Sequence, residues 1–188
     1  MNQRSKIFFI IAIAIVVLTG IYFGVTGIIK YKKNIQYQDL IKSETEKYNT
    51  PNFKDNNSSF IKLPESKEVE PAHFINYEIN YKNSGKQEVQ NLIIETLIPE
   101  NCTLAERYLK GLKYTVSIKK LIIEIGNLGI GNGGKINLTL LTESSLDNGL
   151  KIINPSLKFK YFKENKIIGK SGHFNNDITS KGSLTVKS

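Results

Sequence analysis

The chain has 188 residues, of which 40% are hydrophobic and 10% aromatic, so it can form one domain with a sizeable core plus extra segments. Its formal net charge is +9, but the Lys and Arg residues are spread along the chain, which is not the concentrated patch of a nucleic-acid-binding protein. Cys102 is the only cysteine, so the chain cannot form an internal disulfide, and we expect Cys102 to be a small buried side chain.

The first predicted element is a transmembrane helix over residues 7–29, behind a short flank of residues 1–6. This run holds no charged residue. As a helix it would extend about 35 Å, which is enough to cross a hydrocarbon core of about 30 Å. A cleaved signal peptide would have a shorter apolar run and a small-residue cleavage site, so a retained signal-anchor is favoured. The lipid bilayer is therefore the expected partner of residues 7–29.

The charges that flank this segment do not decide its orientation. Arg4 and Lys6 precede it, whereas Lys30, Lys32 and Lys33 follow it, so the positive-inside rule leans slightly toward a cytoplasmic C-terminal side. We nevertheless predict a single-pass protein with its C-terminal domain extracellular, because of the kind of domain that follows.

Residues 30–69 are predicted to form a polar stalk and linker. Residues 30–49 could continue the helix, but their apolar face is thin, so such a helix would be marginal without a partner. Pro51 and the Asn/Ser-rich run around it should end any helix. The stalk would hold the folded domain clear of the bilayer.

From about residue 70 the apolar residues alternate with polar ones, which is the pattern of half-buried strands. In residues 73–81, Ile75, Tyr77 and Ile79 share one face. The other runs of this type are residues 89–98, 114–118, 121–125, 135–141, 156–162 and 183–187. Short strands separated by turns, with no helix-length periodic segment between them, predict an all-β, immunoglobulin-like antiparallel β-sandwich over residues 70–188.

Residues 129–136, GIGNGGKI, fit the glycine spacing of both a dinucleotide site and a P-loop. Both sites need a helix after the glycines, but the residues from Lys135 to Leu141 alternate as a strand, and Ile136 stands where a P-loop needs Ser or Thr. Asn132 and Gly133 instead form an Asn-Gly pair, which indicates a hairpin turn. We therefore predict no nucleotide partner. A second turn is expected at residues 82–86, with Gly85 free to adopt a positive φ.

Three segments together resemble a known family. They are FINYEINYKNSG (74–85), VQNLIIETLIPEN (89–101) and LIIEIGNLGIGNGGKINLTLLT (121–142). They are similar to the conserved-repeat domain of bacterial and archaeal surface proteins, domain of unknown function eleven. The resemblance covers about residues 70–142 clearly and the remainder to 188 loosely. It implies an immunoglobulin-like sandwich on the outer face of the cell.

The chain departs from that family in three ways. Thr96 stands where the family usually has an acid three residues before the proline, with Glu95 beside it. Glycines and Asn replace the family's Pro-Gly turn, and the domain occurs once. The resemblance carries over no catalytic or ligand-binding residue.

The sequence shows no constellation of catalytic, cofactor-binding or metal-binding residues. His73 and His173 are far apart and lack metal-ligand spacing. Glu143, Asp147 and Asp177 lie near predicted turns, but no calcium-loop pattern supports a site there. We therefore assign no catalytic, cofactor or metal residue, and we predict that the protein is not an enzyme.

The favoured hypothesis is an anchored cell-surface or envelope protein whose sandwich is a structural module or binds a protein or glycan. An envelope protein or an anionic cell-wall polymer is a possible partner, because the surface is basic. The alternative is a subunit of a pilus-like or secretion assembly that packs through its N-terminal helix. Gly20 and Gly24 have the spacing of a helix-pairing face, but the processing site and early Glu of pilin helices are absent.

Overall fold

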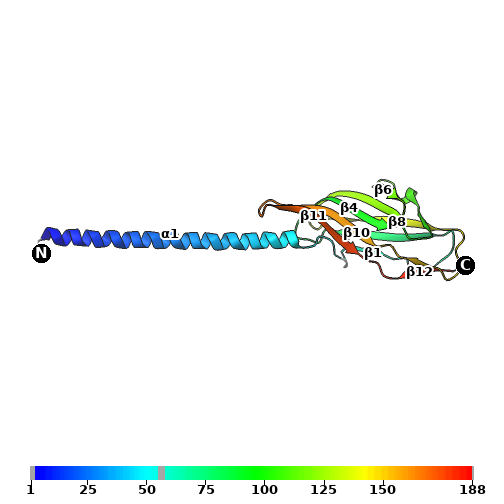
Figure 1. The fold of residues 1–188 in the computed structure, drawn as a ribbon, viewed down its shortest axis with the longest axis horizontal. Helices are drawn as coiled ribbons and strands as arrows, with labels where there is room; N and C mark the ends of the chain where they lie inside the picture. The colour runs from blue at the N-terminus through cyan, green and yellow to red at the C-terminus, as the bar shows by residue number, and fades with distance from the viewer. Residues whose placement is uncertain (1–2, 55–57, 188) are drawn as a thin grey trace. The chain divides into compact units, whose positions relative to one another are not determined.

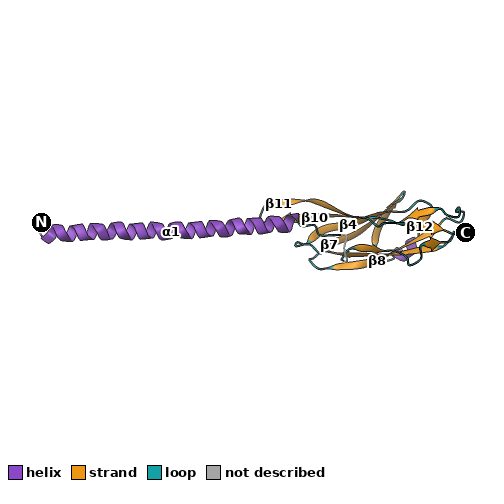
Figure 2. Cartoon of the chain, turned by 90° about the horizontal axis from the view of Figure 1, so that it is seen from below, coloured by secondary structure: helices purple, strands orange, loops and turns teal. Residues whose placement is uncertain are grey.

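The computed structural model describes residues 3–54 and 58–187. Residues 1 and 2 of the predicted flank and residues 55–57 of the predicted linker lie outside the described residues. The chain divides into two compact units, Met1–Thr45 and Glu46–Ser188. The first unit is helical and the second consists mainly of strands (Figure 2).

Helix α1 (Gln3–Asn49) is continuous through the predicted membrane segment and residues 30–49 (Figure 1). It is long and apolar enough to cross a membrane by length and composition. The hydroxyls of Thr19 and Thr26 donate to carbonyls four residues earlier, at 2.9 Å each, so these polar groups are satisfied within the helix. The helix ends at Asn49, two residues before Pro51, as the sequence predicted.

Twelve described strands form two main sheets and a small third one (Figure 1). The four-stranded sheet has the order β1 (Phe60–Lys62), β3 (Phe74–Lys82), β8 (Gly133–Thr142), β5 (Cys102–Leu104). The five-stranded sheet has the order β11 (Lys170–Ile178), β10 (Leu157–Asn165), β4 (Val89–Leu97), β7 (Lys120–Leu128), β6 (Lys113–Ser117). The third sheet has the order β2 (Glu68–Val69), β12 (Ser183–Val186), β9 (Lys151–Ile153), and a 3-10 turn, η1 (Glu106–Leu109), follows β5.

The core lies between the inner faces of the two main sheets, and the predicted alternation is confirmed. Ile79 on β3, Ile94 on β4 and Leu140 on β8 are all fully buried. Cys102 is buried among them, and burial raises the pKa of its thiol to about 11. The β-sandwich prediction therefore holds. It needs one amendment, because β12 pairs with β2 in parallel, at Thr185↔Glu68 and Val186↔Val69.

The domain begins earlier than residue 70, because residues that we assigned to the linker belong to its core. Asn52 is fully buried, and Phe53, 2% exposed, stacks on the Phe159 ring with centroids 4.6 Å apart. Strand β1 joins the four-stranded sheet. The polar composition of this stretch concealed these contacts, which depend on a few side chains and not on a repeating pattern.

The Asn-Gly turn is present, but the predicted hairpin is wrong. Strands β7 and β8 belong to different sheets, so residues 129–132 carry the chain across the sandwich. The turn pairs instead with the end of β3, because Asn83 N–H donates to the Asn132 carbonyl and Gly131 N–H donates to the Asn83 carbonyl, both at 2.8 Å. A strand follows the glycines, as predicted, where a phosphate-binding loop requires a helix.

Gly85 is needed for close packing and not for a positive φ, which corrects our expectation. A Cβ at Gly85 would lie 2.8 Å from Asn52 Cα and 2.7 Å from Asn52 Cγ. Asn52 is itself held by a 2.8 Å hydrogen bond from its Nδ2 to Asn83 Oδ1. The backbone of the turn at 82–86 therefore lies directly against the segment that follows the helix.

We expect Gly85→Ala to lower the free energy of unfolding by about 1–3 kcal/mol, because a methyl group would overlap a fixed backbone atom. Gly129→Ala is the matched control, since its Cβ would meet only the movable Asn132 side chain, at 3.1 Å. Chemical denaturation of the full chain in detergent measures both. Equal losses in the two variants would show that the contact with Asn52 is not a packing constraint.

Candidate functional site: a groove beside strand β3

An open groove of about 730 Å³ lies beside the first half of β3. One side is formed by β3 and the adjacent part of β8, and the other by the connection from β1 to β2. Its lining residues are Lys62, Leu63, Pro64, Glu65, Ser66, Glu68, Val69, Phe74, Ile75, Asn76, Tyr77, Glu78, Tyr108, Asn137, Thr139 and Leu184.

The groove exists because β1 ends early. Strand β8 pairs with all nine residues of β3, but β1 pairs only with Glu78, Ile79 and Asn80. Pro64 has no N–H to donate, and the chain then leaves for the third sheet, where β2 pairs with β12. The stretch Phe74–Tyr77 is therefore left without a strand on its β1 side among the described residues.

The groove has an apolar inner part and a polar outer part. Ile75 and Tyr77 of β3 face inward, and Val69 and Leu184 of the third sheet also line the inner part. On the outer face, Asn76 accepts a hydrogen bond from the Thr139 hydroxyl, at 2.9 Å. Side chains of alternating chemistry along an extended cleft suit a ligand that has both apolar and polar groups.

The residues that line the groove include more acidic than basic side chains. Glu65, Glu68 and Glu78 line it with Lys62. Glu68 is paired with Lys187 at 3.1 Å and Glu78 with Lys135 at 3.3 Å. Hydrogen bonds from Asn80 and then from Lys135 hold the pKa of Glu78 below its usual value, so this carboxylate stays charged. Glu65 is thus the groove carboxylate that can meet a cationic group of a ligand.

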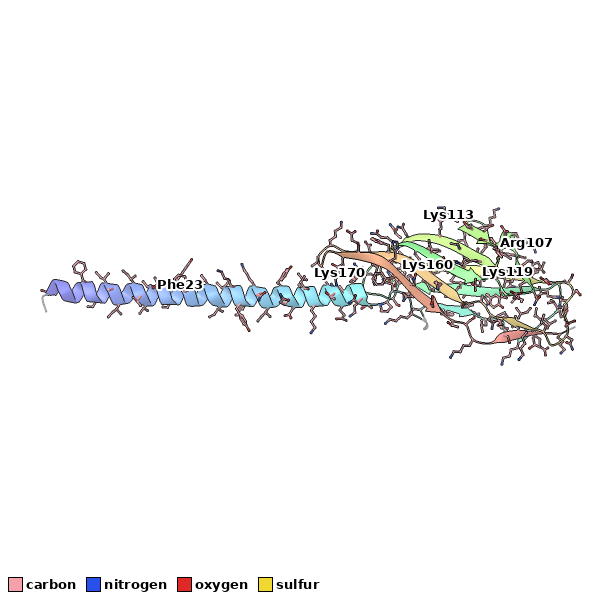
Figure 3. All side chains as sticks on the ribbon, in the orientation of Figure 1. Phe23, Arg107, Lys113, Lys119, Lys160 and Lys170 are labelled. Atoms are coloured by element: carbon pink, nitrogen blue, oxygen red, sulfur yellow. The ribbon has the colours of Figure 1, made fainter. Side chains whose placement is uncertain are left out.

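One end of the groove carries an exposed aromatic pair. The Phe74 and Tyr108 rings are 44% and 48% exposed and meet edge to face, with centroids 6.0 Å apart. The guanidinium of Arg107, labelled in Figure 3, lies 5.1 Å and 4.9 Å from the two ring centroids, and its Nη2 donates to the Tyr108 hydroxyl at 3.0 Å. Rigid, half-exposed aromatic groups of this kind are common anchors for binding partners.

The two histidines singled out in the sequence are not brought together. His73 directly precedes Phe74 at the end of the groove, and its Nε2 lies 3.5 Å from a Glu70 carboxylate oxygen. His173, on the edge strand β11, packs edge-on against Phe162 of β10. No group of three or more metal-ligating side chains occurs in the described part of the chain. The groove was not predicted from the sequence, although Pro64 is a residue at which a strand would be expected to stop.

No family model matches this chain, and no curated protein matches it either, so the resemblance to the conserved-repeat domain stays a prediction. Among solved structures, the collagen-binding domain from a Staphylococcus aureus adhesin is 12% identical, covers 68% of this chain and 100% of that chain, and has a TM-score of 0.38. AvmM, which catalyses macrocyclization in alchivemycin A biosynthesis, is 9% identical over 70% of this chain and 94% of its own, with a TM-score of 0.32. Spo0M, a sporulation control protein from Bacillus subtilis, is 9% identical over 71% and 51%, with a TM-score of 0.28. At these scores the likeness carries no argument about function.

A second feature of the domain is a buried lysine, Lys163 on β10. Its Nζ donates to the carbonyls of Tyr48 and of Thr50, the latter at 3.0 Å. It also lies 4.1 Å from the centroid of the Phe174 ring and 5.5 Å from that of Tyr48. The carbonyls at a helix C-terminus lack intrahelical partners and attract a cation, so Lys163 satisfies the last turn of α1 from within the domain.

Burial lowers the pKa of Lys163 to about 8. The unfolded lysine keeps its proton up to its ordinary pKa, so above about pH 8 the unfolded state binds more protons and stability rises with pH. The neutral amine still has two N–H groups for the two carbonyls. The stabilisation that comes from the lowered pKa of Lys163 is therefore present at high pH and is lost as pH falls through about 8.

We therefore expect the free energy of unfolding of the wild type to rise between about pH 7.5 and 9, relative to Lys163→Met, which has no amine there. Denaturant titrations of both full-length proteins across that range measure the difference. Lys158→Met, at an exposed lysine 3.9 Å from Asp177, is the control and should follow the wild type. Parallel curves for the wild type and Lys163→Met would contradict the assignment.

Proposed function

We propose that the protein is a single-pass, membrane-anchored envelope protein whose β-sandwich binds an extracellular protein or glycan in the groove beside β3. The observation that carries the proposal is one chain that joins a helix able to cross a membrane to a domain with an open, aromatic-rimmed groove. The groove offers hydrogen-bonding and apolar surface without a metal-ligand cluster among the described residues, which favours binding over catalysis.

The helix supports the anchoring part of the proposal. Over residues 10–29 its apolar side chains are exposed, as for Val16 at 70% and Phe23 at 71%, the latter labelled in Figure 3. An exposed apolar surface of that extent needs a cover, and a hydrocarbon core provides one. The helical backbone satisfies its own polar groups, as a lipid environment requires.

The groove supports the binding part. Phe74 and Tyr108 are held by Arg107 and yet remain half-exposed, so they can contact a ligand without rearrangement. The carboxylates of the groove favour a neutral or basic partner there. An anionic cell-wall polymer would instead meet the basic remainder of the surface.

We expect an added protease to remove the domain from intact cells that make the full chain, while a cytoplasmic marker survives. The mass of the chain in the membrane fraction also tests the anchor, because retention of residues 7–29 leaves the full 21.2 kDa and signal cleavage does not. Loss of the domain only after permeabilisation would place it inside the cell. That result would overturn the extracellular assignment.

The double variant Phe74→Ala, Tyr108→Ala should reduce retention of the detergent-solubilised full chain on envelopes from cells that lack the protein. We expect about a tenfold loss, since removing exposed aromatic anchors costs binding energy but no core packing. Ile153→Ala, which truncates an apolar residue that is 73% exposed and outside the groove, is the control. Equal retention of the two variants would remove the groove as the binding site.

A further inference from the structure

The edge of β3 inside the groove carries backbone groups that point into it. At the other end of β3, Lys82 N–H donates to Ser59 Oγ at 3.0 Å, and Ser59 Oγ donates to the Lys82 carbonyl at 3.2 Å. Ser59 immediately precedes β1, so both backbone groups of Lys82 face the β1 side. On the other side, the carbonyl of His73 accepts from Thr142, which belongs to β8.

The N–H and C=O groups of successive residues point to opposite sides of a strand. Residues an even number of positions from Lys82 therefore direct these groups to the same side as Lys82 does. The N–H and C=O groups of Phe74 and Asn76 therefore face the groove, where β1 has already ended. No backbone hydrogen bond to either residue is found on that side within the described residues. A row of unpaired donors and acceptors is a template for another strand.

We propose that this groove binds an extended peptide segment of a partner protein, which adds a strand to the open edge of β3. The inference rests on the proposed function, because it names the class of ligand that the groove takes. Main-chain hydrogen bonds to Phe74 and Asn76 supply affinity, and the walls of the groove select the side chains.

The walls define the chemistry of that peptide. Successive side chains of an added strand point to opposite faces of the sheet. Those that point inward meet Ile75, Tyr77 and Leu184, so they are apolar. Those that point outward lie beside Glu65, which favours a neutral or basic side chain, and beside Glu78, which is already paired with Lys135. The partner segment is thus an alternating apolar and basic stretch.

The dimensions of the gap agree with a short segment. The free stretch Phe74–Tyr77 is about 13 Å long at about 3.3 Å per residue, which accommodates a peptide of about four or five residues. The chain cannot fill the gap by extending β1, since Pro64 follows within two residues and β2 is paired elsewhere. A glycan would use the outer side chains but would leave the open backbone edge unpaired.

Hydrogen exchange of the full chain in detergent micelles tests the proposal, with acetyl-KVKVKV-amide as the probe. Without peptide, the amides of Phe74 and Asn76 should exchange rapidly, whereas those of Ile75 and Tyr77, which face β8, should be protected. Excess probe should slow exchange at Phe74 and Asn76 by about tenfold or more. Acetyl-EVEVEV-amide, of opposite charge, should have little effect. Protection of these amides before any addition, or no protection with the basic probe, would overturn the proposal, as would protection by cellohexaose alone.

Asn76→Pro provides an independent test, because proline removes the N–H that faces the groove, together with the side chain that accepts from the Thr139 hydroxyl. The variant should stay folded and lose at least about tenfold in affinity for a fluorescent KVKVKV probe. Asn76→Ala keeps the backbone donor, so the difference in affinity between Asn76→Ala and Asn76→Pro measures what the N–H contributes. Tyr77→Pro removes an N–H directed at β8 and should unfold. Wild-type affinity of the folded Asn76→Pro variant for the probe would reject the proposal.

Ligand binding in the groove and strand addition to β3 can be rejected separately. If envelope retention still depends on Phe74 and Tyr108 but no peptide protects the edge, the groove binds another ligand and only the strand-addition proposal fails. If neither experiment involves the groove, the proposed function fails as well.

Discussion

The hydrogen bonding of strand β3 is the constraint from which both the core and the groove follow. On one side β3 pairs with β8 over its whole length, and this fixes which of its side chains face the five-stranded sheet. A slip by one residue would turn Ile75, Tyr77 and Ile79 to solvent, so the register is strongly specified. On its other side β3 pairs over three residues only, and the unpaired remainder becomes one wall of the groove.

Buried hydrogen bonds also stabilise the N-terminal end of the domain. Asn52 N–H donates to the Tyr161 hydroxyl at 3.2 Å, and that hydroxyl donates to Asn176 at 2.6 Å. Lys163 donates to the carbonyl of Tyr48, in the last turn of α1, and to that of Thr50, just after the helix. Buried polar groups are costly unless they are paired, so these contacts specify one arrangement of residues 48–53 within the domain. These hydrogen bonds explain why residues 48–53 belong to the compact unit that begins at Glu46.

The sequence predicted what depends on local periodicity. The inward face of β3 and β8, the helix end before Pro51 and the strand after the glycines are all as expected. It did not predict which sheet a strand joins, because an Asn-Gly turn serves a hairpin and a crossing between sheets alike. Strand β11 was also missed, since its residues are polar and it pairs on one side only.

The groove and the buried Lys163 could not be predicted from the sequence, for a different reason. Each depends on residues far apart in the chain, such as Lys163 with Thr50 or Ile75 with Leu184, and no spacing rule links them. From composition alone, the net positive charge predicted a basic surface, and a basic surface predicted anionic partners. The structure shows three carboxylates in the groove beside β3, so the overall charge of the chain does not define the charge at this site.

The position of the open edge also explains how it can be tolerated. Exposed sheet edges can pair with the edges of other sheets. Proteins prevent this pairing with short edge strands, charged side chains or a covering loop. Here β1 covers one end of the β3 edge, and the connection through Pro64 and Glu65 stands opposite the rest. A sheet cannot enter a space bounded in this way, whereas a single extended segment can. The same recess that protects the edge from aggregation therefore gives it selectivity for one strand, with Phe74 and Tyr108 at the entrance.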